Sequence, residues 1–207
     1  METTSIFMAL ICGYLLGSVP FGLLIAKLSG QGDIRDIGSG NIGATNVLRT
    51  GRKDLAALTL VFDAGKAGFA ALIINHFLGV PYGLMAGAAA LIGHCFPLWL
   101  KFKGGKGVAT FFGVLLATSW PIGLAAGAIW LLTAFIGRMS SLAALAAVGL
   151  APLIAIYLDK ENIAAMAAAM AIIIYIRHSE NIVRIIKGTE SKIGEKTKTG
   201  SKTDTQK

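Results

Sequence analysis

Residues 108–137, VATFFGVLLATSWPIGLAAGAIWLLTAFIG, decide the fold, because their length leaves open how many helices they form. A helix needs about 20 apolar residues to cross a bilayer, so this run is too long for one comfortable span and short for two. Trp120 and Pro121 stand together near its middle, and a proline there favours a turn. We therefore expect two short helices within the run.

The composition of the whole chain supports placing this run in a membrane. Of 207 residues, 55% are hydrophobic and 14% are charged, and the mean hydropathy is +0.69. Soluble domains carry about 25% charged residues, and disordered chains are much less apolar, so both classes are excluded. Further apolar runs that could span a bilayer, the last of them short, lie at residues 6–28, 55–78, 82–100, 141–158 and 163–176.

The positions of Lys and Arg set the expected orientation, since these residues collect on the cytoplasmic side of membrane proteins. With two crossings in 108–137, 17 of the 19 basic residues fall on one side or at its edge; Lys160 lies on the other side and Lys66 is buried. With one crossing, Arg138 and the basic residues of 184–207 would lie outside. The sequence thus predicts an all-α integral membrane protein with seven transmembrane helices, an outside N-terminus and a cytoplasmic C-terminus.

Composition and residue spacing also limit which partners and which domain organisation we expect. The net charge of +8 is explained by membrane orientation, so no nucleic-acid partner is expected. Cys12 and Cys95 form neither a disulfide framework nor a zinc-ligand pattern. Three Gly-x-x-x-Gly spacings, at residues 13–17, 83–87 and 123–127, predict close helix packing within one bundle, and we expect a monomer. One transmembrane domain is expected over residues 1–190, followed by a basic, polar, disordered tail over 191–207.

The first of three donor-rich polar segments is DIRDIGSGNIGATNVLR, residues 33–49. Residues 38–43 match G-x-G-x-x-G, but no strand precedes them, which argues against a dinucleotide fold. Consecutive N–H groups of a glycine-rich loop can curl around an anion. A glycine-rich turn with helix caps is the alternative, yet a turn does not need so many donors. The candidate anion-binding residues are Gly38, Ser39, Gly40, Asn41, Gly43, Thr45, Asn46 and Arg49.

The second segment, residues 93–110, contains the sequence GGKG at 104–107, which resembles a phosphate loop. It fails the Walker A pattern, because Gly107 stands where Ser or Thr would hold magnesium and Leu100 occupies the first glycine position. Nucleotide hydrolysis is therefore disfavoured. An anion cradle without metal stays open, at the start of a helix whose dipole favours negative charge. Snorkelling lysines at a membrane edge account for this segment equally well when it is taken alone.

The third segment, residues 177–190, places His178, Asn181 and Arg184 on one helical face, because they are spaced three apart. A lone histidine is more often structural. Here the histidine shares a helical face with Asn181 and Arg184 at the cytoplasmic end of a span, and this arrangement favours a functional role. Two of the three segments could hold phosphate, so the pattern indicates an enzyme that joins an acyl chain to a phosphorylated small molecule.

The chain resembles the bacterial acyl-phosphate:glycerol-3-phosphate acyltransferases over residues 1–190. The features that carry the resemblance are the stretches 17–22 (GSVPFG), 38–49 and 102–110, the pairs Gly93-His94 and Phe96-Pro97, and the block His178, Asn181 and Gly188-Thr189-Glu190. They follow one another in the family's order, and no motif departs from its pattern. The family is similar in having seven helices and an outside N-terminus.

The resemblance implies that a fatty acyl phosphate and sn-glycerol 3-phosphate give 1-acyl-sn-glycerol 3-phosphate (lysophosphatidate) and phosphate, the first step of phospholipid synthesis. It implies no cofactor, no metal, and a site at the cytoplasmic face of a bacterial inner membrane. The residues expected to carry catalysis are Ser39, Arg49, Lys106, His178, Asn181 and Glu190. The residues expected to bind substrate are Gly38, Gly40, Asn41, Gly43, Thr45, Asn46, His94, Lys103, Gly104, Gly105 and Gly107.

Within this set, the 104–107 loop is expected to hold glycerol 3-phosphate, and Ser39 and Arg49 the acyl phosphate head. His178 and Asn181 would orient the attacking hydroxyl, with Glu190 in support. The base is either His178 or the departing phosphate. An acyl-enzyme on Ser39 is less favoured, because no adjacent base is evident.

Two other functions remain as alternatives. Asp63 and Lys66 lie inside an expected span and three residues apart, so they can pair. Such a pair is equally compatible with a functional site and with fixed helix packing. It alone favours a phosphate or organic-anion transporter, whose site would lie at the membrane midplane between two repeats. A structural membrane subunit would not explain the three donor-rich segments.

Overall fold

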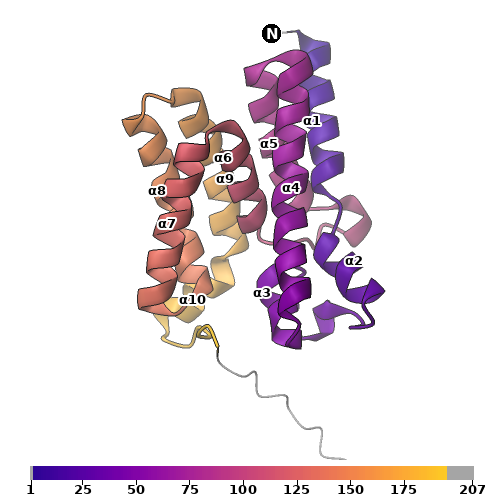
Figure 1. Cartoon of the computed structure of the whole chain (residues 1–207), viewed down its shortest axis with the longest axis vertical. Coiled ribbons are helices and arrows are strands. Elements are labelled where there is room, and N and C mark those ends of the chain that lie inside the picture. The colour runs from indigo at the N-terminus through magenta and orange to yellow at the C-terminus, as the bar shows by residue number, and fades with distance from the viewer. Residues whose placement is uncertain (1, 195–207) are drawn as a thin grey trace, which may run out of the picture.

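Long apolar helices make up most of the chain (Figure 1). The computed structural model describes residues 2–194, within which there is no strand. By length and composition, five helical stretches could each cross a membrane, or six if α9 and α10 form one bent span. The α-helices are α1 Thr3–Gly17, α2 Phe21–Leu28, α3 Ala44–Val47, α4 Lys53–Leu78, α5 Val80–Cys95, α6 Val108–Thr118, α7 Trp120–Gly137, α8 Ser140–Tyr157, α9 Glu161–Arg177 and α10 Ser179–Ile186.

The run 108–137 divides into two helices, as its Trp-Pro pair predicts. α6 ends at Thr118 and α7 begins at Trp120, with Ser119 between them in an extended conformation (φ −159°, ψ 86°). Pro121 is tolerated in the first turn of α7, where its missing N–H would have no helical partner. α6 has only 11 residues, which is shorter than a full bilayer span.

Prolines also interrupt two of the other expected spans. In the run 6–28, α1 ends at Gly17 and α2 begins at Phe21, because Pro20 has no N–H with which to continue the hydrogen-bond ladder. In the run 82–100, α5 ends at Cys95, and a short 3-10 helix, η3 Leu98–Leu100, follows Pro97. Backbone carbonyls near these breaks are free to accept hydrogen bonds from other parts of the chain.

Small residues bring helices together inside the bundle. A Cβ on Gly13 or Gly17 of α1 would collide with the backbone of Ala86 or Ala90 of α5. The expected packing role is confirmed for this face, because only glycine allows the two backbones to approach so closely. Gly127 of α7 differs, since a Cβ there would meet no atom within 4 Å.

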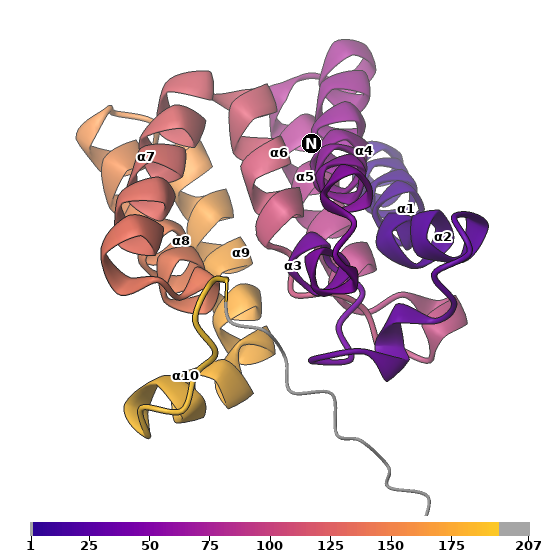
Figure 2. The ribbon, with the colours of Figure 1, turned by 60° about the horizontal axis from the view of Figure 1, so that its bottom comes forward.

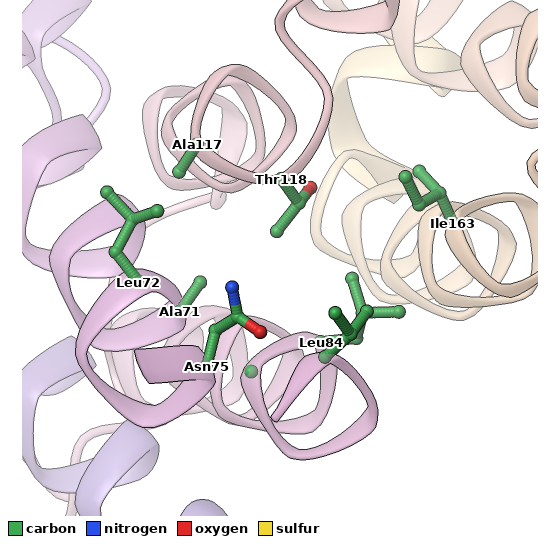
Figure 3. A pocket seen from close by; sticks show the side chains of 9 residues that line it. Ala71, Leu72, Asn75, Leu84, Ala117, Thr118 and Ile163 are labelled. Carbon is green, nitrogen blue, oxygen red and sulfur yellow. The ribbon is translucent and has the colours of Figure 1, made fainter. Parts of the chain in front are cut away.

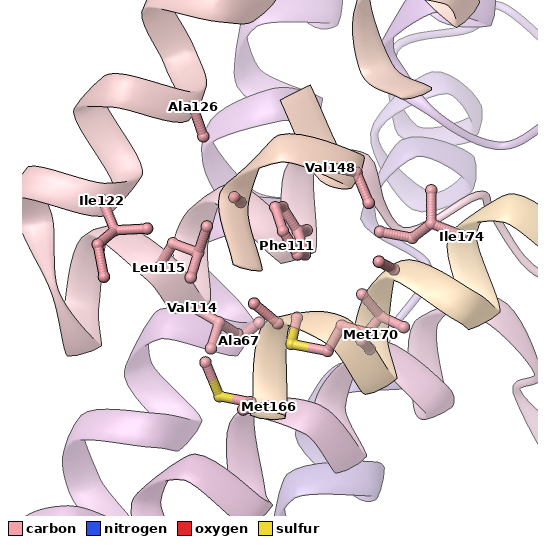
Figure 4. Close-up of a cluster of buried hydrophobic side chains, with 14 of the residues drawn as sticks. Ala67, Phe111, Val114, Leu115, Ile122, Ala126, Val148, Met166, Met170 and Ile174 are labelled. Atoms are coloured by element: carbon pink, nitrogen blue, oxygen red, sulfur yellow. The ribbon is translucent and has the colours of Figure 1, made fainter. Parts of the chain in front are cut away.

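The main apolar core surrounds α6 (Figure 4). Phe111, Val114 and Leu115 of α6 are fully buried there, together with Met170 and Ile174 of α9. Because lipid is as apolar as these side chains, close packing rather than water exclusion stabilises such a cluster in a membrane. α6 is thereby held between the other helices, and the loop that precedes it has a fixed place.

The polar connections gather at one end of the molecule. Figure 1 shows the N-terminus at the top and α2, α3 and α10 at the bottom, and Figure 2 brings that lower end forward. The expected tail of residues 191–207 is described only to residue 194, and residues 195–207 lie outside the described part.

Candidate active site

The loop between α2 and α4 is folded around the side chain of Asn46 in α3, which is 2% exposed. Its Nδ2 donates to the carbonyls of Ile34 (2.7 Å) and Ile37 (3.0 Å). Its Oδ1 accepts from the N–H of Ser39 (3.1 Å) and from the Ser39 hydroxyl (3.3 Å). The sequence predicts that Asn46 binds substrate, but both ends of its amide are engaged within the loop. Asn46 builds the loop.

Arg49 lies beside Ser39, because both contact the same atom. The Arg49 Nη1 donates to Asn46 Oδ1 (3.2 Å), and its Nη2 donates to the hydroxyl of Ser191 (3.1 Å). Gly38 makes room for this guanidinium: its φ is +57°, and a Cβ there would lie 2.6 Å from Arg49 Cδ. Ser39 itself is exposed, so the loop presents a hydroxyl and a cation side by side.

The other predicted residues of this loop shape it. Asn41 Oδ1 accepts from the Gly43 N–H (3.0 Å) and closes a local turn. Gly40 has a φ of +68°, which few other residues adopt without strain. Thr45 is exposed at the surface of α3. The backbone around Arg49 is therefore set by glycines and asparagines.

The Gly104-Gly105 turn does not offer its own amides to an anion, in contrast to the expected cradle. The Gly104 N–H donates to the Cys95 carbonyl (3.2 Å), and the Gly105 N–H donates to the His94 carbonyl (3.0 Å). Both amides are used to fasten the turn to the end of α5. An anion at this turn is left with the Lys106 side chain and the N-terminal end of α6, whose dipole favours negative charge.

The residues on either side of this turn differ in burial. Gly107 is buried with a φ of +83°, and a Cβ there would lie 3.0 Å from Cys95 Sγ, so the position needs glycine. Lys103 is exposed. Lys106 is half-buried and points away from water toward α10, as its contacts show.

A hydrogen-bond network centred on Asn181 and Glu190 receives Lys106. Lys106 Nζ donates to Asn181 Oδ1 (2.5 Å), and Asn181 Nδ2 donates to Glu190 Oε1 (2.6 Å). Ser141 of α8 donates its hydroxyl to the same oxygen (2.7 Å), and Arg184 Nε donates to Glu190 Oε2 (2.7 Å). The side chain of Glu190 is only 6% exposed. The network joins four parts of the chain in one polar cluster.

The charges in this cluster perturb one another. Burial lowers the pKa of Lys106, and the positive charge of Arg184 lowers it further. Burial raises the pKa of Glu190, but hydrogen bonds from Ser141, Asn181 and Arg184 outweigh that effect, so its pKa lies below the usual range. Glu190 is therefore an anion that holds its neighbours in place, and Lys106 is a cation that is only partly solvated.

His178 lies at the junction of α9 and α10 and is 3% exposed. Its Nδ1 lies 2.8 Å from the carbonyl of Ile174, and a carbonyl can only accept, so Nδ1 carries the proton and Nε2 is left as an acceptor. Burial lowers the pKa of His178 to about 4. The ring is thus neutral at physiological pH and suited to accept a hydrogen bond from a hydroxyl.

Two contacts connect the three polar segments. Lys106 reaches Asn181 from the second segment to the third, and Arg49 reaches Ser191, the residue after Glu190. The chain then continues to Ile193, whose N–H donates to the Arg138 carbonyl (2.6 Å) at the end of α7. Residues far apart in sequence therefore meet at one end of the bundle.

His94 is buried, at 4% exposure. Its Nδ1 lies 2.9 Å from Lys66 Nζ, which also donates to Asp63 Oδ1 (2.7 Å) and to the Val19 carbonyl (2.7 Å). The carbonyl belongs to the break between α1 and α2. Asp63 and Lys66 do pair, as expected, and their partners tie α4 to α5 and to that break. His94 is therefore a supporting residue in this structure.

Sequence reasoning did not single out Arg177, Ser141 or Ser191. Arg177 Nη2 donates to the Gly104 carbonyl (2.9 Å), and its Nε donates to the Gly105 carbonyl (3.1 Å). The one signal in the sequence is that Arg177 precedes the predicted site residue His178. Ser141 and Ser191 carry no signal, because only the packing of distant segments brings them to Glu190 and Arg49.

A cavity elsewhere in the molecule contains none of these residues. It is a small space of about 90 Å³ among α4, α5, α6 and α9, lined by Asn75, Thr118 and mostly apolar side chains (Figure 3). These residues lie at the ends of their helices that are remote from Lys106, since Asn75 is in the last turn of α4 and Thr118 ends α6. The polar cluster is therefore the better candidate site.

The donor set of the cluster suits phosphorylated anions. Arg49, Lys106 and Arg184 are cations, and neutral hydroxyls and amides stand between them. Among residues 2–194, no group of three or more His, Cys, Asp or Glu side chains is placed to hold a metal ion. With Nδ1 engaged by the Ile174 carbonyl, His178 Nε2 is an acceptor that a substrate hydroxyl can use.

Comparison with known proteins agrees with this chemistry. A profile of the glycerol-3-phosphate acyltransferase family matches residues 7–188. The chain is 58% identical over 196 residues to the glycerol-3-phosphate acyltransferase of Maricaulis maris, covering 93% of this chain and 91% of that protein. It is 57% identical over 196 residues to that of Rhodospirillum rubrum, covering 91% of each.

Solved structures give the same result. The fold resembles the crystal structure of PlsY, an integral membrane glycerol 3-phosphate acyltransferase, in its glycerol 3-phosphate form, with a TM-score of 0.86 and 39% identity over 92% of this chain and 96% of that one. The lysophosphatidic acid form of PlsY matches with a TM-score of 0.85 and 38% identity, over the same shares. This protein belongs to the glycerol-3-phosphate acyltransferase family.

Proposed function

We propose that this protein transfers a fatty acyl group from acyl phosphate to sn-glycerol 3-phosphate and releases phosphate. The new bond joins the C1 oxygen of glycerol 3-phosphate to the acyl carbonyl carbon, and the bond from that carbon to the phosphate oxygen breaks. The observation that carries the proposal is the contact of Lys106 with the Asn181–Glu190 network, which holds a cation beside the neutral donors Asn181 and Ser141. Family membership narrows the anion to glycerol 3-phosphate.

The two phosphorylated substrates require separate cations, since each brings negative charge. We assign glycerol 3-phosphate to Lys106 and the N-terminal end of α6. The acyl phosphate head is assigned to Arg49 and Ser39, which contact the same atom of Asn46. Arg49 is always charged and its planar fork matches a phosphate oxygen pair. Charge repulsion between the substrates is the main barrier to their meeting, and these cations reduce it.

The attacking hydroxyl is oriented by His178 Nε2, and the proton goes to the departing phosphate. A neutral imidazole with a pKa of about 4 is a weak base, whereas the oxygen of the departing phosphate gains negative charge as its bond to the acyl carbon breaks, so the phosphate accepts the proton more readily. His178 therefore positions the hydroxyl and does not need to become an imidazolium. Asn181 and Glu190 hold Lys106 and the start of α10 in register.

The proposed setting is a bacterial inner membrane, crossed seven times by a monomer with its N-terminus outside and its site at the cytoplasmic face. Two features support this topology: α2, α3 and α10 lie at the end opposite the N-terminus (Figure 1), and most basic residues belong to that end. The helices and the site segments fall within residues 1–190, which we propose as the catalytic domain, with 191–207 as an extension.

One assay tests the reaction. Purified protein is given labelled glycerol 3-phosphate and palmitoyl phosphate without metal or cofactor, and lysophosphatidate is measured. In parallel, the protein is reconstituted in liposomes and uptake of the labelled substrate is measured. We expect lysophosphatidate to form without net uptake. Uptake without acyl transfer would overturn the proposal in favour of the transporter.

A further inference from the structure

The Gly104-Gly105 turn is held from the side of α9 by a single side chain. Both carbonyls of the turn accept hydrogen bonds from the guanidinium of Arg177, at 2.9 Å from Nη2 to Gly104 and 3.1 Å from Nε to Gly105. The Arg177 Cζ also lies 5.4 Å from the centre of the Phe96 ring. Arg177 is half-buried at the end of α9. Its position is therefore fixed by three contacts.

The same turn is held from the opposite side by the end of α5. The two glycine N–H groups donate to the carbonyls of Cys95 and His94. A Cβ on Gly105 would collide with the imidazole of His94, and a Cβ on Gly104 would collide with the His94 carbonyl. The turn thus lies between the end of α5 and the guanidinium of Arg177, and its backbone has little freedom to shift.

This arrangement bears directly on Lys106, the next residue. Lys106 Nζ donates to Asn181, and Asn181 stands four residues after Arg177 on the neighbouring helix. One short segment therefore holds both the backbone that carries Lys106 and the side chain that receives it. Arg177 itself makes its contacts with backbone carbonyls, so it acts through another residue.

We propose that Arg177 is a positioning residue, which clamps the Gly104-Gly105 turn so that Lys106 points at the phosphate of glycerol 3-phosphate. The proposal rests on the role given to Lys106 above. Arginine suits this contact because its planar fork holds two consecutive carbonyls in one fixed geometry, whereas the ammonium of a lysine is a compact point charge on a flexible stem. No contact of Arg177 involves the loop that carries Ser39 and Arg49, so the acyl phosphate head is bound independently of it.

The test compares Arg177→Lys and Arg177→Gln with the wild type in steady-state kinetics for each substrate. Displacing a catalytic cation by about 1 Å costs about 100-fold in rate, and we expect kcat/KM for glycerol 3-phosphate to fall by about that factor in Arg177→Gln. Arg177→Lys should recover only part of the loss. KM for palmitoyl phosphate should stay within about twofold of the wild-type value, because changes at independent sites affect each other by no more than about that factor.

Arg52→Lys is the matched control. Arg52 also makes a two-point contact, from Nε to Asp54 Oδ1 (2.9 Å) and from Nη2 to Asp54 Oδ2 (2.6 Å), but on the exposed surface at the start of α4. It should leave both kinetic parameters unchanged. A second control is Arg177→Gln in a Lys106→Arg background, where we expect at most about a twofold further loss because the two changes disturb the same contact.

The thermal midpoint in detergent identifies variants that are simply misfolded. Wild-type-like kinetics in both Arg177 variants would overturn the proposal. So would a lower midpoint with equal losses for both substrates, which would give Arg177 a general structural role. Failure of the proposed function is distinguishable, because it would appear as absence of acyl transfer in the wild-type protein.

Discussion

Lys106 has the least ordinary environment among the proposed cations, since its ammonium is half-buried and contacts the side-chain oxygen of Asn181. A buried cation is poorly solvated before substrate arrives, so an anion can replace lost hydration at small cost. Glu190 does not contact Lys106 directly; it acts through Asn181 and Arg184. The cation is therefore held near an anion without being neutralised by a direct ion pair.

Lys106→Ala should lower kcat/KM for glycerol 3-phosphate by about 100-fold or more, the usual loss when one preorganised donor to developing charge is removed. The measurement is the acyl-transfer assay with purified protein. Lys101→Asn is the control: Lys101 is an exposed lysine of the same loop with a φ of 52°, a conformation that asparagine tolerates. Equal activities in the two variants would remove Lys106 from the site.

The pH profile should reveal the same residue. Burial lowers the pKa of Lys106, with Arg184 and Arg177 adding positive charge nearby and Glu190 and Glu180 opposing them. Lys106 is charged below that pKa, so kcat/KM for glycerol 3-phosphate is expected to fall as pH rises through it, at a lower pH than a surface lysine would show. In Lys106→Arg the guanidinium stays charged, and the alkaline fall should move to higher pH. An unchanged profile would contradict this assignment.

At the scale of elements, proline and glycine decide where helices end and how closely they pack. Trp120 and Pro121 correctly predict the separation of α6 from α7, because a proline is favoured in the first turn of a helix; Pro152 is an exception, since it lies inside α8. The same reasoning applied to Pro20 and Pro97 would have found the ends of α1 and α5. Local chemistry of this kind can be read from the sequence.

Contacts between elements could not be predicted in this way. Gly104 and Gly105 look like free phosphate ligands in the sequence, yet their amides are used by carbonyls at the end of α5. Arg177 contacts the turn although it lies more than 70 positions further along the chain. No spacing rule connects such segments, since the contact depends on how α5 and α9 pack. The sequence pattern identifies the three polar segments. Only the tertiary structure shows which of their polar groups are already engaged by other parts of the protein.

Gly17→Ala should destabilise the α1–α5 pair, since the added Cβ collides with the backbone of Ala90. Overpacking of this kind costs about 1–3 kcal/mol, which a lower thermal midpoint in detergent would report. Gly127→Ala is the matched control in the interior of α7, where a Cβ meets nothing within 4 Å and higher helix propensity favours the variant slightly. Equal midpoints would mean that α1 and α5 are not packed as described.

At the scale of the whole molecule, the distribution of Lys and Arg and the position of the polar loops favour the same orientation in the membrane. Among residues 2–194, most Lys and Arg residues belong to the end with the site segments, Lys66 is buried, and Lys160 lies at the other end, in the short connection between α8 and α9. A cation-rich face is what the inner surface of a membrane favours. Soluble glycerol 3-phosphate would reach the site from that face, and the acyl chain would reach it through lipid.

Labelling of single cysteines tests the orientation. In a background with Cys12 and Cys95 replaced by alanine, Thr4→Cys and Lys160→Cys should react with an impermeant maleimide on intact cells. Arg138→Cys and Lys187→Cys should react only after lysis, because seven crossings place them inside. All four positions are exposed on the protein surface, so burial does not decide the result. Arg138 and Lys160 reacting from the same side would exclude the seven-helix topology.

The hydrogen bonds from Arg49 to Ser191 and from Ile193 to Arg138 have a consequence for biosynthesis. The membrane-length helices of residues 2–194 all precede Glu190 in the chain, so insertion into the bilayer can finish before the last residues of the candidate site are made. We expect a protein truncated just before that carboxylate to be anchored in the membrane and, from the role proposed for Glu190, to lack acyl transfer. With the role proposed for Glu190, acyl transfer therefore begins only after residue 190 has been translated.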